Sequence, residues 1–177
     1  ANLTKRTMNE ELPKLLNGVI SILSKYPEDR ILIHTVSYKV RDYLLENLSN
    51  GRIITHSSKN RAERLNEFKK SLEPLVMLSP SFDRGIDLPQ DQCRVIIICK
   101  VPFPDLGDAQ IGKRVRLLGG WQWYSTKAAQ TLVQMSGRAV RSSTDHCDTY
   151  IFDKQFGRFS LRMRDVLPNW WLNAITR

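Results

Sequence analysis

Five short apolar runs, separated by longer amphipathic segments, set the strongest constraint on the fold of this chain. The apolar runs occupy residues 31–35, 52–55, 75–78, 95–99 and 148–153. Apolar side chains recur with helical spacing over residues 8–25, 40–48, 60–71 and 126–139, and a last helix is expected near 161–167. Glycines and prolines prevent a regular assignment over 102–123. Continuously apolar strands that alternate with helices predict an α/β domain, with a mainly parallel central sheet flanked by helices on both faces.

The size and charge of the chain limit the number of domains it can form and the classes of partner it is expected to bind. Its 177 residues suffice for a single domain with a full core. Lys and Arg number 27 against 18 Asp and Glu, and this net charge of +9 suggests a polyanionic partner, either nucleic acid or nucleotide phosphate. Cys93, Cys99 and Cys147 lack the paired spacing of a zinc or iron–sulfur site, so no metal site is expected. No apolar run reaches the roughly 18 to 20 residues of a membrane span, so no membrane partner is expected.

Ligands of parallel sheets bind at the carboxyl ends of the strands, so the loops after the apolar runs are the places to look for chemistry. Thr35, Ser37 and Tyr38 follow the first run, and Ser37 is placed to cap the next helix. A helix amino terminus offers unpaired N–H groups to a phosphate, although for this loop taken alone simple capping is the favoured explanation. Ser57 follows the second run, where it could contact a phosphate or only begin a solvated helix.

The loop after the third run combines hydroxyl, aromatic, glycine and acidic residues. Ser81 and Phe82 come first, and Gly85 then permits a close approach of the backbone. Asp87 could accept hydrogen bonds from sugar hydroxyls or hold a neighbouring arginine. An ordinary turn with a capping aspartate is the alternative interpretation.

The stretch 134–141 places two arginines three positions apart behind a glycine. If the stretch is helical, Arg138 and Arg141 share one face. Two guanidinium forks on one face suit the oxygens of a polyphosphate, and Gln134 adds both a donor and an acceptor. A solvated basic helix end is the alternative. Asp145, a little farther on, could orient an arginine or could be a turn residue.

Taken together, these loops resemble the second motor domain of superfamily 2 helicases. Residues 84–87 resemble motif V of that superfamily, and residues 134–141 resemble motif VI. The finer resemblance is to the XPD/DinG group of DNA helicases, in which Ser37 and Tyr38 match motif IV; it extends over residues 12–168. Arg84 stands where the group often has glutamate, which leaves the local charge near the nucleic acid open.

The resemblance implies a RecA-like three-layer domain and assigns roles to the loop residues. Arg138 and Arg141 would be arginine fingers in catalysis, aligned with the help of Gln134. The remaining implied contacts are Gly85, Asp87 and Gly137 with ATP, and Thr35, Ser37, Tyr38, Ser57, Ser81 and Phe82 with the nucleic acid. The implied partner is single-stranded DNA, with RNA not excluded, and the implied direction of translocation is 5′ to 3′. The implied compartment is the cytoplasm of a prokaryote or a phage host, or the nucleus of a eukaryote.

Two features of an NTPase are missing from the sequence. There is no Gly-rich loop ending in Gly-Lys-Ser/Thr, and no Asp-Glu pair follows an apolar run. The resemblance therefore implies that 1–177 is one C-terminal helicase domain of a larger protein. A first motor domain would hold ATP and Mg²⁺ with its Walker A and B elements, and any iron–sulfur cluster would lie outside this chain. The fragment alone is not expected to hydrolyse ATP.

Two other functions fit the same residues. One is a module that binds nucleic acid or protein without turnover, using Trp121, Trp123 and Tyr124 beside Arg114 and Arg116. Such aromatic residues more often fill a core or a domain interface. The other is the second domain of an RNA helicase. His34, inside an apolar run, is predicted to be a hydrogen-bonded core residue.

Overall fold

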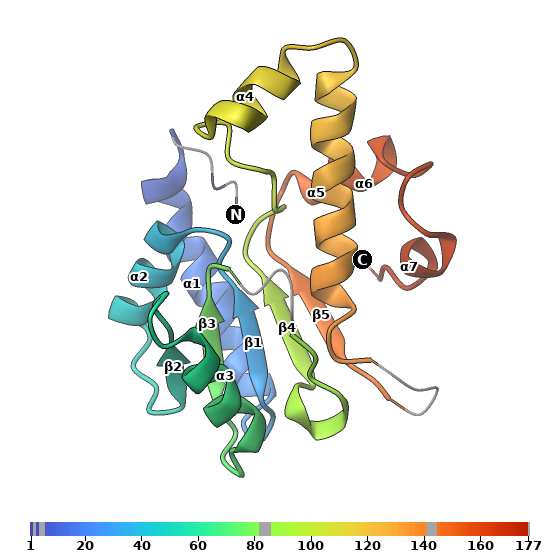
Figure 1. Ribbon diagram of the computed structural model, residues 1–177. Helices are drawn as coiled ribbons and strands as arrows, with labels where there is room; N and C mark the ends of the chain where they lie inside the picture. Colours follow the sequence, from blue (N-terminus) through green and yellow to red (C-terminus); the bar gives the residue numbers. More distant parts are fainter. Residues whose placement is uncertain (2, 4–5, 82–85, 141–144, 177) are drawn as a thin grey trace.

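The computed structural model describes residues 1, 3, 6–81, 86–140 and 145–176. They form a five-stranded parallel sheet with strand order β2-β3-β1-β4-β5 (Figure 1). The strands are β1 (Ile31–His34), β2 (Ile53–Thr55), β3 (Val76–Ser79), β4 (Val95–Ile98) and β5 (Asp148–Ile151). The helices are α1 (Met8–Lys25), α2 (Tyr38–Asn47), α3 (Arg61–Lys70), the short 3-10 helix η1 (Gln90–Gln92), α4 (Ala109–Val115), α5 (Gly120–Ser136), α6 (Phe156–Arg162) and α7 (Asn169–Asn173). The predicted α/β fold is confirmed.

Helices cover both faces of the sheet because alternate side chains of each buried strand point to opposite faces. Ile31 and Ile33 of β1 pack in a cluster with apolar residues of α1 and α2. Leu32 points the other way, into a cluster with Phe68 of α3 and apolar residues of α5, α6 and α7. Figure 1 shows the same division into three layers. The RecA-like arrangement implied by the resemblance is therefore present.

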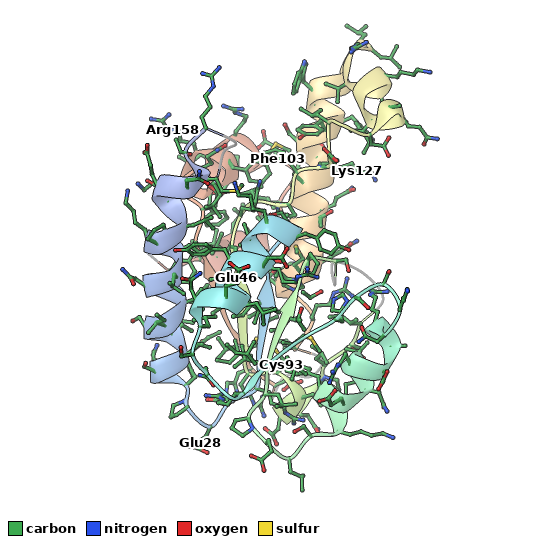
Figure 2. The ribbon with its side chains drawn as sticks, turned by 90° about the vertical axis from the view of Figure 1, so that its left-hand side faces the viewer. Glu28, Glu46, Cys93, Phe103, Lys127 and Arg158 are labelled. Carbon is green, nitrogen blue, oxygen red and sulfur yellow. The ribbon has the colours of Figure 1, made fainter. Side chains whose placement is uncertain are left out.

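The region 102–123, unassigned from the sequence, forms α4 and the first turn of α5. Helix α5 begins at Gly120, well before the predicted start at 126. Gly119 turns the chain with a φ of 72°, and a Cβ on Gly120 would lie only 2.4 Å from the carbonyl oxygens of Arg114 and Val115. The glycine pair thus allows α4 to pack closely on α5. In Figures 1 and 2, α4 and the first part of α5 stand beyond the end of the sheet.

The last part of the chain forms two short helices, so the single helix predicted near 161–167 is wrong. Phe159, Met163 and Trp171 are buried at helix-compatible spacing, and they pack in the same apolar cluster as the buried residues of α5. Pro168 interrupts that pattern because proline disfavours a helical conformation in the residue before it. Helix α6 has already ended at Arg162, and α7 begins at Asn169, directly after Pro168. Among the described residues, no helix combines the length and apolar character needed to cross a lipid bilayer.

Candidate functional site at the carboxyl edge of the sheet

The turn after β1 has an unusual backbone conformation directly before helix α2. Val36 has a φ of 59°, a left-handed value that β-branched residues rarely adopt. The Thr35 hydroxyl donates to the Ser37 carbonyl at 3.1 Å, and Ser37 Oγ accepts from the N–H of Val40 at 3.2 Å. The predicted N-cap role of Ser37 is confirmed. Backbone strain of this kind collects at ligand-binding sites, which makes the turn a candidate phosphate contact.

The residues of this turn differ in their access to solvent. Thr35 is fully buried, and its N–H donates to the carbonyl of Ser79 at 2.9 Å. Tyr38 is 56% exposed, and the guanidinium of Arg41 lies 4.8 Å from its ring centre. Ser37 is half-buried between them. A ligand at this edge can therefore reach Ser37 and Tyr38. Thr35 is out of reach, and its hydrogen bonds stabilise the turn from within the core.

The exits of β2 and β3 are joined by a buried polar contact. Nε2 of His56 lies 2.7 Å from Oγ of Ser79, which also accepts from the N–H of Ser81 at 3.2 Å. Ser81 is half-buried and Ser57 is exposed. Oγ of Ser57 donates to Oδ1 of Asn60 at 2.9 Å. Because β1, β3 and β2 are adjacent, Ser37, Ser81 and Ser57 follow neighbouring strands along one edge.

Two hydrogen bonds join segment 86–88 to the turn after α5. Nη1 of Arg138 donates to the carbonyl of Ile86 at 3.0 Å, and the N–H of Leu88 donates to the carbonyl of Arg138 at 3.1 Å. Ile86 and Leu88 are buried, whereas Asp87 between them is exposed. Two of the predicted site residues, Asp87 and Arg138, are thus brought together by the fold.

Arg138 does not lie on a helical face, so this part of the sequence interpretation is wrong. Helix α5 ends at Ser136, and Gly137 caps it by donating its N–H to the carbonyl of Val133 at 3.0 Å. Oγ of Ser136 donates to the carbonyl of Leu132 at 3.1 Å. The carbonyl of Arg138 accepts from the Leu88 N–H of another loop, so it makes no helical hydrogen bond. These contacts end the helix before the first arginine. The predicted residues Arg141, Gly85 and Phe82 lie outside the described residues.

A polar hollow of about 410 Å³ opens beside the end of α5. Its lining residues are Lys127, Gln130, Thr131, Gln134 and Arg138. Gln134 is exposed and Arg138 is half-buried, so both can meet a ligand in the hollow. Two cationic side chains beside amide and hydroxyl groups suit an anion with several oxygens.

His34 lies at the end of β1 and is fully buried. Burial, with a smaller contribution from the positive charge of Arg138, lowers the pKa of His34 to about 3. Among the described residues, neither ring nitrogen has a hydrogen-bond partner. The predicted burial is confirmed, but the predicted hydrogen bonding is not found in this part of the chain. His34 is a neutral imidazole within the influence of the Arg138 charge.

The depressed pKa of His34 makes stability depend on pH. The unfolded chain binds a proton at this imidazole below about pH 6.5, whereas the folded chain does so only near pH 3. Stability therefore falls as the pH decreases through this window, by about 2 kcal/mol between pH 7 and pH 5. Urea unfolding at the two pH values should show this loss. An unchanged slope in His34→Leu would exclude His34 as its source.

Sequence comparison identifies the family. A model of the helicase C-terminal domain family matches residues 19–174, which is most of the chain. The chain belongs to the helicase C-terminal domain family. The resemblance seen in the loops is therefore confirmed at the level of the family.

The helicase C-terminal domain has relatives among complete DNA helicases. It is 23% identical to the ATP-dependent DNA helicase CHL1 of Saccharomyces cerevisiae (strain YJM789) over 187 residues, covering 93% of this chain and 22% of that protein. It is 20% identical to the ATP-dependent DNA helicase chl-1 of Caenorhabditis elegans over 173 residues, covering 90% of this chain and 20% of that protein. The chain thus spans about a fifth of the length of these curated relatives.

Solved structures share the fold of this helicase C-terminal domain. Xpd4 of S. tokodaii superposes with a TM-score of 0.69 at 19% identity, covering 96% of this chain and 35% of that chain. The C-terminal domain of the DEAD-box protein Dbp5 superposes with a TM-score of 0.60 at 13% identity, covering 93% of this chain and 81% of that chain. At these identities the likeness concerns the fold.

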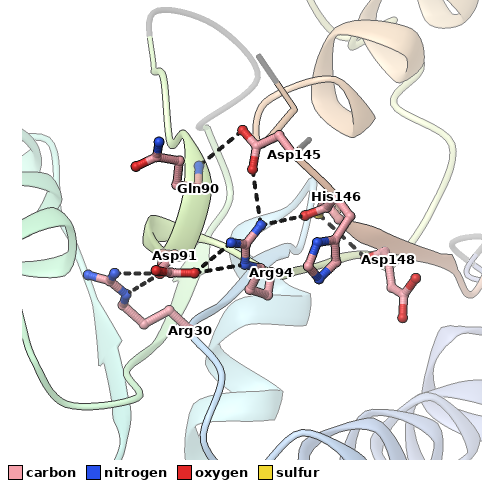
Figure 3. A network of polar contacts seen from close by, with 8 residues as sticks. Arg30, Gln90, Asp91, Arg94, Asp145, His146 and Asp148 are labelled. Carbon is pink, nitrogen blue, oxygen red and sulfur yellow. Dashed lines mark hydrogen bonds and ion pairs between the residues drawn. The ribbon is translucent and has the colours of Figure 1, made fainter. Parts of the chain in front are cut away.

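Asp145 of the helicase C-terminal domain orients an arginine, one of the two roles suggested by the sequence. Its Oδ1 lies 3.0 Å from Nη1 of Arg94, and its Oδ2 accepts from the N–H of Gln90 at 3.1 Å (Figure 3). Arg94 also donates to the carbonyl of His146 at 3.1 Å. Arg94 directly precedes β4, so this cluster lies at the amino end of that strand. Gln90 is two residues from Leu88, so the cluster adjoins the turn that carries Arg138.

Sequence reasoning missed part of the site. Lys127, Gln130 and Thr131 were not singled out, although they line the same hollow as Gln134 and Arg138. Their spacing from Gln134 could have shown it, because residues three and four positions apart share a helical face. That argument requires a helix that runs through Lys127 to Ser136, and the helical prediction over 126–139 supplied one.

Proposed function

We propose that this chain is the second motor lobe of an ATP-dependent DNA helicase, acting on ATP that is held mainly by a first lobe. The observation that carries the proposal is the polar hollow beside the end of α5 in which Arg138, Lys127 and Gln134 meet. Arg138 is tied to segment 86–88, so the two family motifs form one surface. Such a surface can face a triphosphate across a cleft.

The proposed chemistry is electrostatic. Arg138 and Arg141 act as arginine fingers, which stabilise the negative charge that develops on the γ-phosphate during hydrolysis. Gln134 aligns a finger or the attacking water, while Gly85, Asp87 and Gly137 contact the nucleotide. Mg²⁺ is assigned, like the bulk of the ATP, mainly to the first lobe. There it would neutralise phosphate charge.

The proposed nucleic-acid contact follows the same edge of the sheet. Ser37, Tyr38, Ser57 and Ser81, with Phe82, grip a single strand through hydrogen bonds to phosphate and through stacking. Thr35 does not contact the strand directly; its hydroxyl stabilises the turn that places Ser37 at the surface. The bonds between segment 86–88 and Arg138 connect this surface to the nucleotide site. Closure on ATP and opening after hydrolysis would then move the strand, in the 5′ to 3′ direction.

The test is strand-dependent turnover in the protein that carries both lobes. We expect single-stranded DNA to stimulate ATP hydrolysis, and duplexes with a 5′ single-stranded tail to be unwound. Duplexes with a 3′ tail serve as the control for direction. Hydrolysis that responds only to RNA would favour an RNA helicase, and strand binding without any effect on hydrolysis would favour a binding module.

A further inference from the structure

A second hollow, of about 500 Å³, lies between the carboxyl edge of the sheet and the helical pair α4–α5. Its lining residues are Val36, Pro80, Ser81, Pro102, Phe103, Pro104, Ile111, Trp123, Lys127, Thr131 and Met135. Val36 and Ser81 belong to the turns after β1 and β3. The hollow is therefore continuous with the proposed strand contacts. Figure 2 labels Phe103 and Lys127 at the level where α5 rises beyond the sheet.

The walls of this hollow are mostly apolar, and several contacts hold them in place. The ring of Phe103 stacks on Tyr124 at a centroid distance of 5.4 Å and meets Phe159 edge-on at 5.3 Å. The Tyr124 hydroxyl donates to the carbonyl of Pro104 at 2.9 Å, which ties the proline segment to α5. The guanidinium of Arg114 lies 4.5 Å from the ring centre of Trp123. A flat apolar group that entered here would meet an ordered surface that includes an indole ring.

The charge around the hollow selects the class of occupant. Lys127 lines it, and Lys113, Arg114 and Arg116 are exposed on or beside α4. An apolar floor bordered by cations suits a nucleotide. The base can stack on the apolar side chains, and the phosphates of the backbone can pair with the cations.

From this placement, we propose that the hollow takes one unstacked nucleobase of the bound single strand, with Trp123 as its stacking surface and Lys127 beside the adjacent phosphate. The proposal rests on the proposed function, in which Ser37 and Ser81 hold the same strand. Trp123 becomes a nucleic-acid-binding residue in addition to those of the motifs.

The proposal also gives α5 a connecting role. Trp123, Lys127 and Thr131 are spaced four positions apart and so lie along one face of the helix. Lys127 and Thr131 line both this hollow and the one that contains Gln134 and Arg138. A strand in the first hollow therefore contacts the same side chains as a phosphate in the second.

The test measures binding of a fluorescent oligothymidylate to the 177-residue chain by anisotropy. We expect Trp123→Ala to weaken binding about tenfold, and Trp123→Phe to retain most of the affinity, since stacking on one aromatic ring is worth about this much. The matched control is Trp170→Ala, because Trp170 lies on α7, is 64% exposed and does not line the hollow. It should bind within about twofold of the unaltered chain.

An oligonucleotide with the same backbone but no bases completes the test. The unaltered chain should bind it about tenfold more weakly than oligothymidylate, whereas Trp123→Ala should bind the two strands alike. Equal affinity of Trp123→Ala and the unaltered chain for oligothymidylate would overturn the base site alone. A Trp123→Ala loss of the same size on both strands would also overturn it, since Trp123 would then act without contacting a base. Failure of the unaltered chain to bind either strand would overturn the strand contact of the proposed function as well.

Discussion

Replacing Arg138 with alanine is expected to lower ATP turnover about 10³-fold in the protein that carries both lobes. The expected loss follows from the position of Arg138 in the polar hollow with Gln134 and Lys127. A guanidinium that meets charge developing in the transition state accelerates the reaction without strengthening ground-state binding. ATP binding should therefore change only a few-fold. Steady-state hydrolysis and equilibrium binding of a nucleotide analogue measure the two effects separately.

Arg138 also donates a hydrogen bond to the carbonyl of Ile86, so a structural effect has to be distinguished from a catalytic one. Arg138→Lys keeps the positive charge but loses the planar fork, and it should recover only part of the rate. Arg158→Ala, at an exposed position on α6, is the control for removal of a surface arginine. Arg141→Ala is expected to behave like Arg138→Ala. Turnover near the unaltered value in both alanine variants would remove the arginine fingers from the mechanism.

The sheet could be predicted from the sequence because its three central strands are buried on both faces. The residues of β1, β3 and β4 are all buried, and a continuously apolar run is what such strands require. Ser37 could be predicted as a cap for a similar reason, since a hydroxyl before a helix satisfies an N–H that the helix leaves free. These are local relations between a residue and its immediate neighbours in the chain.

Features that depend on long-range contacts were missed. The start of α5 depends on the fit of Gly120 against the carbonyl groups of α4, and the composition of 102–123 does not reveal that contact. Its end depends on the hydrogen bond from the Leu88 N–H to the Arg138 carbonyl. The hollow around Trp123 depends on three loops and two helices that meet only in the folded chain. For that reason the sequence identified the motifs of the site but not the surface between them.

Exchange of Asp145 for asparagine is expected to lower the free energy of unfolding by about 2 kcal/mol, because it removes the charge of a buried carboxylate that accepts hydrogen bonds from the Arg94 guanidinium and the Gln90 N–H. The Asp145 side chain is only 2% exposed, and the Arg94 side chain is 20% exposed. The carboxylate of Asp145 bonds both the Arg94 guanidinium and the N–H of Gln90 (Figure 3). For a domain of this size the loss corresponds to a decrease in the melting temperature of about 6 °C, which calorimetry would measure.

The matched control is Asp91→Asn, which removes a second carboxylate from the same arginine. Oδ1 of Asp91 lies 2.6 Å from Nη2 of Arg94, closer than Asp145, but its side chain is 84% exposed. Solvent screens that pair, so the control should lose well under about 1 kcal/mol. Equal losses in the two variants would show that burial does not set the strength of these ion pairs.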